Sequence, residues 1–376
     1  MIPYGRQSIS AQDIDAVVEV LKSDFLTQGP QVPLFEKKIS ALVHSQHAVA
    51  VNSATSALHI ACLALGVGKG DIVWTSPISF VASANCALYC GANINFVDID
   101  LDTGNMSVSA LQEQLQWAKQ HNCLPKVVIP VHLAGQSCDM KAIHQLAKKY
   151  HFSIIEDASH AIGSQYKKSL VGSCQYSDIA IFSFHPVKII TSAEGGMALT
   201  NNAKLAESMR LFRSHGITSQ TNKMTEPSHG PWYYQQIALG FNYRMTELQA
   251  ALGRSQAACL ADFVSQRNAL AKIYDDAFSN SSLTLLTPKA STYSSYHLYI
   301  VLLPFFHDKT KNKTLHKQVI TNIRAKNICA HVHYIPIHLQ PYYQELGFKL
   351  GDFPAAEEYY QRAISLPLHP QLTTKE

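Results

Sequence analysis

Short apolar runs alternate with segments of helical spacing along the first half of the chain. The runs of strand length lie at 48–51, 72–75, 94–98, 126–131, 153–157 and 179–184. Segments in which apolar residues recur every three or four positions separate most of them, at 52–65, 77–89, 109–121 and 139–150. This alternation predicts an α/β fold, with a mostly parallel sheet and helices on both of its faces.

The remaining segments follow a different pattern. Ser10 and Asp13 resemble a capping box for a helix that reaches Leu21, and residues 33–42 are also predicted to be helical. Residues 214–240 are irregular, which is typical of a functional or mobile loop. Further helices are predicted at 205–213, 245–256, 259–278, 313–326 and 354–364, with strands at 296–303 and 328–334.

Length and the change of pattern predict two domains. The chain has 376 residues, which is long for one ordinary core. From about residue 260 the elements become shorter and more mixed. We therefore expect an N-terminal arm and a large domain over 1–258, followed by a smaller α+β domain over 259–376.

Composition narrows the classes of protein. Hydrophobic residues make up 47% of the chain and charged residues 15%, so a sizeable core is expected. The net charge of +4, without a long basic run, argues against a nucleic-acid partner. We expect no signal peptide, no membrane span and no metal site. Eight cysteines without a C-x-x-C pair indicate a reducing compartment, so a cytoplasmic protein is expected.

Lys188 is the first candidate for chemistry. It follows the apolar run 179–184 and precedes the pair Gly195-Gly196 and another apolar run. A lysine held between buried strands loses solvation, and its pKa falls. An amine of this kind is suited to Schiff-base chemistry with a carbonyl group.

Other features at predicted strand ends supply what a carbonyl cofactor needs. Asp157 ends one strand, Ser183 ends another, and residues 53–56 begin a helix whose free N–H groups favour an anion. Phe80 supplies an aromatic ring. Pyridoxal 5′-phosphate (PLP) fits this set, because it combines an aldehyde, a ring nitrogen, a flat ring and a phosphate.

Each feature also has a plain structural explanation. Lys188 could be an exposed turn lysine, Asp157 a helix cap, and His160 and Phe80 core residues, while Ser183 could bond only to the backbone. What favours the cofactor is their joint placement at the carboxyl ends of strands in one predicted sheet.

Several sequence blocks then resemble one family, the sugar nucleotide aminotransferases of the DegT/DnrJ/EryC1/StrS type. The strongest block is SFHPVK at 183–188 with AEGG at 193–196. Further blocks lie at 52–57, 77–82, 130–135, 156–161, 213–216, 240–245 and 333–334. The resemblance extends over nearly the whole chain.

The resemblance implies a PLP-dependent aspartate aminotransferase fold of type I, in a homodimer with shared active sites. It identifies Lys188 as the Schiff-base lysine and Asp157 as the partner of the pyridine nitrogen. His160 would lie beside the phenolic oxygen, and Phe80 would stack on the ring. The residues implied for the phosphate are Ala54, Thr55, Ser183 and, from the other subunit, Asn242.

The resemblance further implies a substrate. Blocks at 25–29, 75–82, 211–216 and 332–337 are similar to the subfamily that forms UDP-4-amino-4,6-dideoxy-N-acetyl-β-L-altrosamine, a step towards pseudaminic acid. The expected reaction converts a UDP-4-keto-6-deoxy-N-acetylhexosamine to its 4-amino sugar, with L-glutamate as amino donor. The candidate substrate-binding residues are Tyr4, Thr27, Arg213, His215, Arg244 and His333.

Three alternatives stay open at this stage. One is a 4-aminotransferase for another nucleotide sugar, of the bacillosamine type or another O-antigen amino sugar. The second is a sugar dehydratase of the same family, in which histidine replaces the lysine, and the third is a non-catalytic relative; the presence of Lys188 and Asp157 argues against both. Relatives usually continue with one more helix after the SLP block at 365–367, which this chain is expected to lack.

Overall fold

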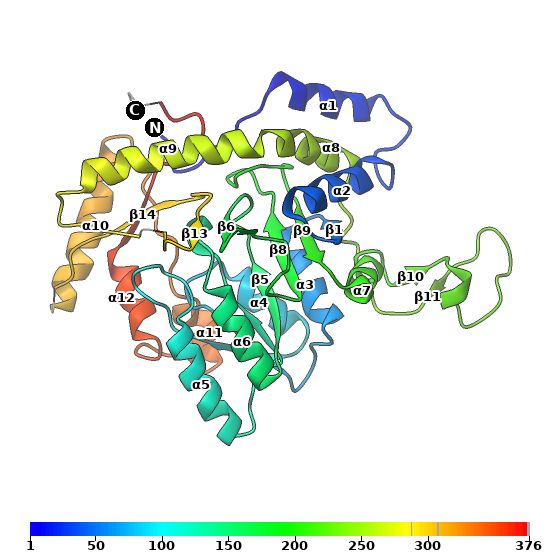
Figure 1. Cartoon of the computed structure of the whole chain (residues 1–376), viewed down its shortest axis with the longest axis horizontal. Helices are drawn as coiled ribbons and strands as arrows, with labels where there is room; N and C mark the ends of the chain where they lie inside the picture. The colour runs from blue at the N-terminus through cyan, green and yellow to red at the C-terminus, as the bar shows by residue number, and fades with distance from the viewer. Residues whose placement is uncertain (287, 307, 374–376) are drawn as a thin grey trace.

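A central seven-stranded sheet organises the chain. The computed structural model describes residues 1–286, 288–306 and 308–373 (Figure 1). The strands are β1 (His47–Val51), β2 (Ile72–Thr75), β3 (Asn93–Phe96), β4 (Val127–Ile129), β5 (Ser153–Asp157), β8 (Ile179–Ser183) and β9 (Gly196–Thr200). Their order is β1-β9-β8-β5-β4-β2-β3, and only β9 is antiparallel to its neighbours. The predicted mostly parallel sheet is confirmed.

Helices cover both faces of this sheet. Val49 and Val51 of β1 belong to the core that contains α3 (Ala54–Ala64), α4 (Ala82–Tyr89) and α7 (Ala203–Arg213). Ala48 and Ala50 face the other way, against α2 (Gln31–Val43) and α8 (Glu247–Gln256). On that second face, α5 (Val108–Gln120) and α6 (Met140–Tyr150) cover β4 and β5. Alternating strand positions therefore feed two separate cores.

A smaller antiparallel sheet forms in the last third of the chain. It consists of β12 (Thr284–Leu285), β14 (Tyr299–Leu302) and β15 (Ala363–Leu366). A separate core joins these strands to α9 (Leu260–Phe278), and α10 (Lys309–Ala325) and α12 (Pro354–Arg362) lie on the same side in Figure 1. A short 3₁₀ turn at Ala257–Cys259 separates α8 from α9. The domain boundary after residue 258 stays a prediction.

The N-terminal elements agree with the sequence. α1 (Ala11–Leu21) begins with the predicted capping box, in which the Ser10 side chain accepts a hydrogen bond from Asp13 N–H and the Asp13 side chain accepts one from Ser10 N–H. The remaining short elements are β6 (Gln165–Tyr166), β7 (Ser169–Leu170), β13 (Thr292–Tyr293) and α11 (Pro341–Glu345).

Two predicted elements are wrong. The helix predicted from residue 77 begins at Ala82, because the Ser76 side chain accepts a hydrogen bond from Ile78 N–H and bends the chain first. The strand predicted at 328–334 is reduced to isolated bridges, Ile2–Ile328 and His331–Ser365. Residues 363–364, predicted to end the preceding helix, instead begin β15, which pairs with β14 along its length and meets the segment 328–334 at His331.

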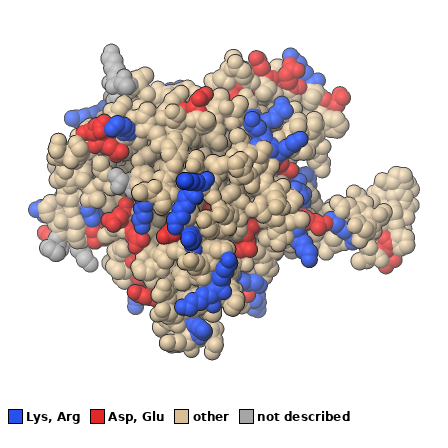
Figure 2. Space-filling model, viewed as in Figure 1, with Lys and Arg blue, Asp and Glu red and all other residues tan. Residues whose placement is uncertain are grey.

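Residues 214–240 form an arm that projects from the body of the molecule. The arm holds a two-stranded hairpin of β10 (Ile217–Thr218) and β11 (Gln235–Gln236), at the right of Figure 1. Trp232 and Leu239 on it are 75% and 78% exposed. Figure 2 shows few charged side chains on its visible face. The loop prediction thus missed the hairpin but located the segment that leaves the globular body.

No helix within the described ranges is long and apolar enough to cross a membrane. The last residues, 374–376, where the chain was expected to stop short of a further helix, lie outside the part that the structure describes.

Candidate active site

Lys188 lies in a turn just beyond the carboxyl end of β8. Its N–H donates to His185 O at 2.9 Å, and Ser192 N–H donates to Phe184 O at 2.9 Å, which closes the loop. The side chain is half-buried. Burial lowers the pKa of Lys188 to about 8, although the nearby Asp157 carboxylate opposes the shift. A substantial fraction of this amine is therefore unprotonated, and nucleophilic, at neutral to mildly alkaline pH.

Asp157 is the last residue of β5 and is 5% exposed. Ser83 of α4 donates its hydroxyl hydrogen to Asp157 Oδ2 at 2.6 Å, and Ser159 N–H donates to Oδ1 at 3.2 Å. Ser83 in turn pairs with Ser79 at 2.7 Å. The carboxylate is thus held in one orientation from two elements, as a group that must meet a fixed partner requires.

His160 is held in one tautomer by its neighbours. Ala134 N–H donates to Nδ1 at 3.3 Å, and Nε2 lies 3.1 Å from the Tyr334 hydroxyl. A backbone N–H can only donate, so Nδ1 carries no proton and the neutral ring has its hydrogen on Nε2. Burial, with the charges of Lys188 and His333, keeps the pKa of His160 well below its usual value. The Tyr334 hydroxyl accepts from this ring and keeps its own hydrogen for another acceptor.

His333 and Tyr4 close the same region from the other end of the chain. His333 Nδ1 lies 2.8 Å from Ser365 Oγ, and its ring centroid is 5.1 Å from that of Tyr4. Burial, then the nearby His331 and Lys188, lower the pKa of His333 to about 3. The N-terminal segment is anchored there, since Leu368 N–H donates to Tyr4 O at 3.0 Å.

We call Lys188, Asp157, His160, His333 and Tyr334 the lysine centre. Lys188 interacts electrostatically with Asp157, His160 and His333. The sequence-based expectation that strand-end residues would meet is therefore realised in the fold, while their functional roles stay predictions. Phe80 lies at its border, 59% exposed, with its ring centroid 6.4 Å from that of Tyr334.

The N-terminus of α3 provides an anion cradle. The Ser53 side chain accepts a hydrogen bond from Ser56 N–H at 3.1 Å, and Ala57 N–H donates to Ser53 O. Within the described residues, the N–H groups of Ala54 and Thr55 have no protein acceptor. Free N–H groups at a helix N-terminus bind phosphate well.

Gly196 makes this cradle sterically feasible. A Cβ built on it would lie 2.4 Å from the carbonyl carbon and oxygen of Ser53 and 2.5 Å from Ala54 N. β9 therefore passes directly against the backbone of the cradle. Ser183 pairs with Gly196 in the sheet, which brings its side chain to the same neighbourhood.

The other predicted binding residues lie apart from the lysine centre. Thr27 bridges to Thr246, and Arg213 Nη1 is bonded to Glu36 at 2.7 Å and to Ala50 O at 2.8 Å. Within one chain, the Arg213 guanidinium therefore contacts α2 and β1.

The rest of this second set lies at the base of the arm. His215 N–H donates to Phe241 O, and Arg244 is half-buried. Asn242 is exposed, and its carbonyl oxygen accepts from Asn52 Nδ2 at 3.5 Å, next to the cradle. Among the described residues, no hydrogen bond or ion pair links the side chains of these three residues to Lys188.

Three residues near the centre were not predicted. Ser83 orients Asp157, Tyr334 contacts His160, and the His297 ring centroid is 4.3 Å from that of His160. Burial, with the charge of His160 and others, holds the pKa of His297 well below its usual value. Tyr334 stands in a block that carried the family resemblance, whereas Ser83 and His297 gave no signal.

Among the described residues, no group of three or more His, Cys, Asp or Glu side chains is arranged to hold a metal ion. The lysine centre itself offers an amine, a fixed carboxylate and neutral imidazoles, with the phosphate cradle adjoining it.

Comparisons with known proteins agree with this geometry. Residues 7–376 match the family model described as the DegT/DnrJ/EryC1/StrS aminotransferase family. UDP-4-amino-4,6-dideoxy-N-acetyl-beta-L-altrosamine transaminase of Campylobacter jejuni is 37% identical, over 100% of this chain and 94% of that protein.

Two solved structures have closely similar folds. PseC of Helicobacter pylori, an aminotransferase involved in the biosynthesis of pseudoaminic acid, has a TM-score of 0.90 at 35% identity, over 100% of this chain and 95% of that one. A Streptococcus pneumoniae protein solved in PLP, PMP and apo forms has, in its PLP form, a TM-score of 0.88 at 30% identity, with coverage of 100% and 95%.

Proposed function

This chain belongs to the DegT/DnrJ/EryC1/StrS aminotransferase family, and we propose that it aminates the 4-keto group of a UDP-4-keto-6-deoxy-N-acetylhexosamine. It is a PLP-dependent sugar aminotransferase with the type I aspartate aminotransferase fold. L-Glutamate is the proposed amino donor, and pseudaminic acid biosynthesis the proposed pathway. The observation that carries the proposal is a lysine of lowered pKa beside a fixed carboxylate and a phosphate cradle.

The residues present fit PLP. The free N–H groups of Ala54 and Thr55 suit its phosphate, and Gly196 leaves room where any Cβ would strike the cradle. The Asp157 carboxylate, fixed by Ser83, suits a protonated ring nitrogen. The Lys188 amine suits its aldehyde. Phe80 would offer an aromatic face, and Ser183 a hydroxyl.

When bound, PLP supplies an electron sink for the carbon that loses a proton. Lys188 would take that proton and return one in the second half-reaction. Its lowered pKa leaves part of the amine unprotonated near neutral pH, so it can act as a base. Asp157 would keep the ring nitrogen protonated. His160 stays neutral beside Lys188, so it would lie beside the phenolic oxygen without adding a second positive charge.

We propose that two copies of the chain share their active sites. The arm presents Trp232, Leu239 and Ile237 to solvent, and a two-stranded hairpin is at best marginally stable alone. A second copy would bury these side chains. Asn242, at the base of the arm, would then reach the phosphate of the partner subunit, and the substrate contacts of Thr27, Arg213, His215 and Arg244 would form there.

The remaining substrate residues would act from within the chain. Tyr4 and His333 border the lysine centre, and we propose that they contact the sugar. A cytoplasmic location is proposed as well, supported by eight cysteines that are all free.

The decisive assay supplies L-glutamate with purified UDP-4-keto-6-deoxy-N-acetylhexosamines of both C5 configurations. The expected result is stoichiometric 2-oxoglutarate and 4-amino sugar from the β-L-arabino configured substrate. Turnover of the other configuration alone would favour a bacillosamine-type activity. If the holoenzyme converts neither sugar but still exchanges glutamate and 2-oxoglutarate, the proposed sugar is wrong. The substrate would then be another nucleotide sugar.

A further inference from the structure

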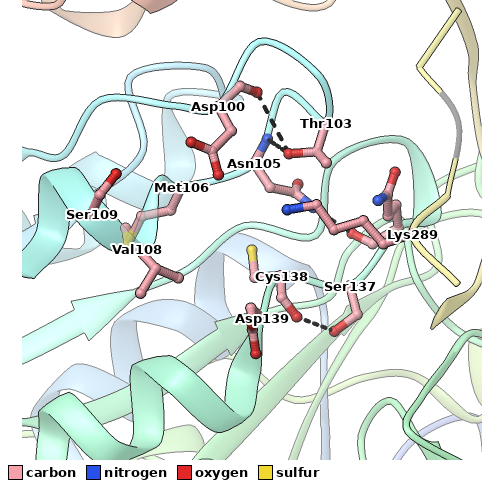
Figure 3. A pocket seen from close by; sticks show the side chains of 11 residues that line it. Asp100, Thr103, Asn105, Met106, Val108, Ser109, Ser137, Cys138, Asp139 and Lys289 are labelled. Carbon is pink, nitrogen blue, oxygen red and sulfur yellow. Dashed lines mark hydrogen bonds between the residues drawn. The ribbon is translucent and has the colours of Figure 1, made fainter. Parts of the chain in front are cut away.

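A separate cavity of about 250 Å³ lies beyond the carboxyl ends of β3 and β4 (Figure 3). Its walls are formed by six residues of the segment that leads into α5, by the turn 136–139 that leads into α6, and by Lys289. The six are Asp100, Thr103, Asn105, Met106, Val108 and Ser109. No member of the lysine centre lines it. The volume far exceeds the roughly 10–15 Å³ that one water molecule needs, so a small organic molecule fits.

Gln136 gives this cavity an unused hydrogen-bond donor. The residue is 5% exposed, and its Nε2 has no partner among the residues that the structure describes. Its backbone is fixed, because Asn105 Nδ2 donates to Gln136 O at 3.0 Å and Asn105 Oδ1 accepts from Leu133 N–H at 2.9 Å. A buried amide without a partner is destabilising, and an acceptor in the cavity would relieve it.

Two opposite charges approach the cavity from opposite sides. Figure 3 shows Asp100 on one side and Lys289 on the other. In the described parts of the chain, neither side chain has an ion-pair or hydrogen-bond partner. Asp139 differs, because its carboxylate already accepts from Ala142 N–H and the Tyr166 hydroxyl. Among the described residues, Asp100 and Lys289 therefore offer wholly unpaired charges, whereas Asp139 binds both of its donors through Oδ1.

The first turn of α5 adds donors at the same wall. Ser107 caps the helix by accepting from Ala110 N–H at 3.4 Å, which leaves the N–H groups of Val108 and Ser109 at the helix N-terminus. Partial positive charge there favours an anionic group.

We propose that this cavity binds a free α-amino acid at a site distinct from the lysine centre. The carboxylate of the ligand pairs with Lys289, the Gln136 amide and the N-terminus of α5, and its ammonium group pairs with Asp100. The cavity shares one loop with the centre, because Ala134, two residues before Gln136, donates its N–H to His160. The loop 133–137 therefore links a ligand bound in the cavity to the lysine centre.

The test is isothermal titration of the PLP-loaded enzyme with L-serine, and with acetate and methylammonium as its two charged halves. L-Serine is expected to bind one site per chain without changing the visible absorption of the cofactor, at least tenfold more tightly than either half. Equal binding of acetate would mean a simple anion site and overturn the proposal. Heat seen only together with a change in cofactor absorption would mean binding at the lysine centre and overturn it as well.

Substitutions of cavity residues test whether the heat of L-serine binding comes from this cavity. Gln136→Leu and Asp100→Asn are each expected to weaken L-serine binding at least tenfold. Lys289→Met, at a position outside the sheet core, tests the carboxylate contact if Gln136→Leu fails to fold. The matched control is Asp102→Asn, an exposed neighbour that does not line the cavity. Unchanged binding in Asp100→Asn and Lys289→Met would refute the site.

Discussion

The lysine centre and the arm differ in how far their own chain completes them. Asp157 and His160 are buried and hydrogen-bonded on more than one atom. The arm exposes Trp232 and Leu239, and a hairpin of two-residue strands holds it. A single chain therefore orients the reacting groups by itself. Its arm, in contrast, leaves apolar side chains exposed, and we propose that a second copy covers them. Five experiments test this contrast, beginning with the largest expected effect.

The largest effect is expected for Lys188→Ala, which removes the reactive amine from the lysine centre. We expect the rate of amino transfer to fall about 10⁴-fold or more, because one side chain supplies both the nucleophile and the proton carrier. The measurement is single-turnover amino transfer, with circular dichroism to verify folding. Lys204→Ala, an exposed lysine on α7, is the matched control. A variant within tenfold of the wild-type rate would place the chemistry elsewhere.

Asp157→Asn tests whether the fixed charge matters beyond its geometry. Loss of one preorganised electrostatic group is expected to lower kcat about 10²–10³-fold. Ser83→Ala keeps the charge and removes only the hydroxyl that orients it, so a smaller loss, about tenfold, is expected. Equal losses in both variants would show that orientation, not charge, is what Asp157 provides.

Substitutions in the arm are expected to weaken the dimer rather than the chemical step. In the double variant Trp232→Ser and Leu239→Ser, we expect the dimer dissociation constant to rise about 10²-fold, as when interface anchors are truncated. Sedimentation velocity over a range of concentrations measures this rise. Ile273→Ser is the control, since Ile273 is 51% exposed on α9, away from the arm. An unchanged dimer in the double variant would remove the arm from the interface.

Gly196→Ala perturbs the cradle without removing a polar side chain. The new Cβ meets backbone atoms that cannot swing aside, so we expect a stability loss of about 1–3 kcal/mol and roughly tenfold weaker PLP binding. Thermal unfolding and PLP titration of the apoprotein provide the two values. Gly68→Ala is matched to it, because no heavy atom lies within 4 Å of the added Cβ. Comparable effects in both variants would exclude a specific role for Gly196.

The pH dependence of PLP capture should be the mildest effect. The pKa of Lys188 is lowered from 10.5 to about 8, so the reactive amine fraction falls as pH drops below 8. We expect the rate of capture by the apoprotein to rise about fivefold from pH 7 to pH 8 and to level off above pH 9. Stopped-flow absorption measures it. A rate that still rises about eightfold between pH 9 and pH 10 would mean a solvated lysine with its ordinary pKa of 10.5.

The sequence predicted the sheet better than its connections. Strands such as β4 and β8 lie in apolar runs, because both of their faces are buried. The direction of β9 gave no such signal, since it depends on pairing with β1, far away in the chain. The segment 328–334 has strand-like composition, but in the described structure it meets β15 through one bridge, His331–Ser365, and forms no continuous ladder with it.

The same distinction applies to the lysine centre. The ends of the strands can be predicted from the local sequence. Their positions predicted that Lys188, Asp157 and Ser183 lie close together at one edge of the sheet. Ser83 lies 74 residues from Asp157 and Tyr334 lies 174 from His160, so only the folded chain reveals those contacts. Thr27, Arg244 and Asn242 have no described side-chain contact with the lysine centre, and their proposed partners belong to a second copy of the chain or to the substrate.

The position of β9 also has a consequence for how the protein is made. β1 pairs only with β9 in the central sheet, and its residue His47 faces Thr200. At roughly 5–20 residues per second, a ribosome needs about 8–30 s to add the intervening segment. During that interval β1 is an unpaired apolar edge on a nascent chain, open to wrong partners. Chains that end before residue 200 are therefore expected to require a chaperone, and none of them can yet form the PLP cradle against Gly196.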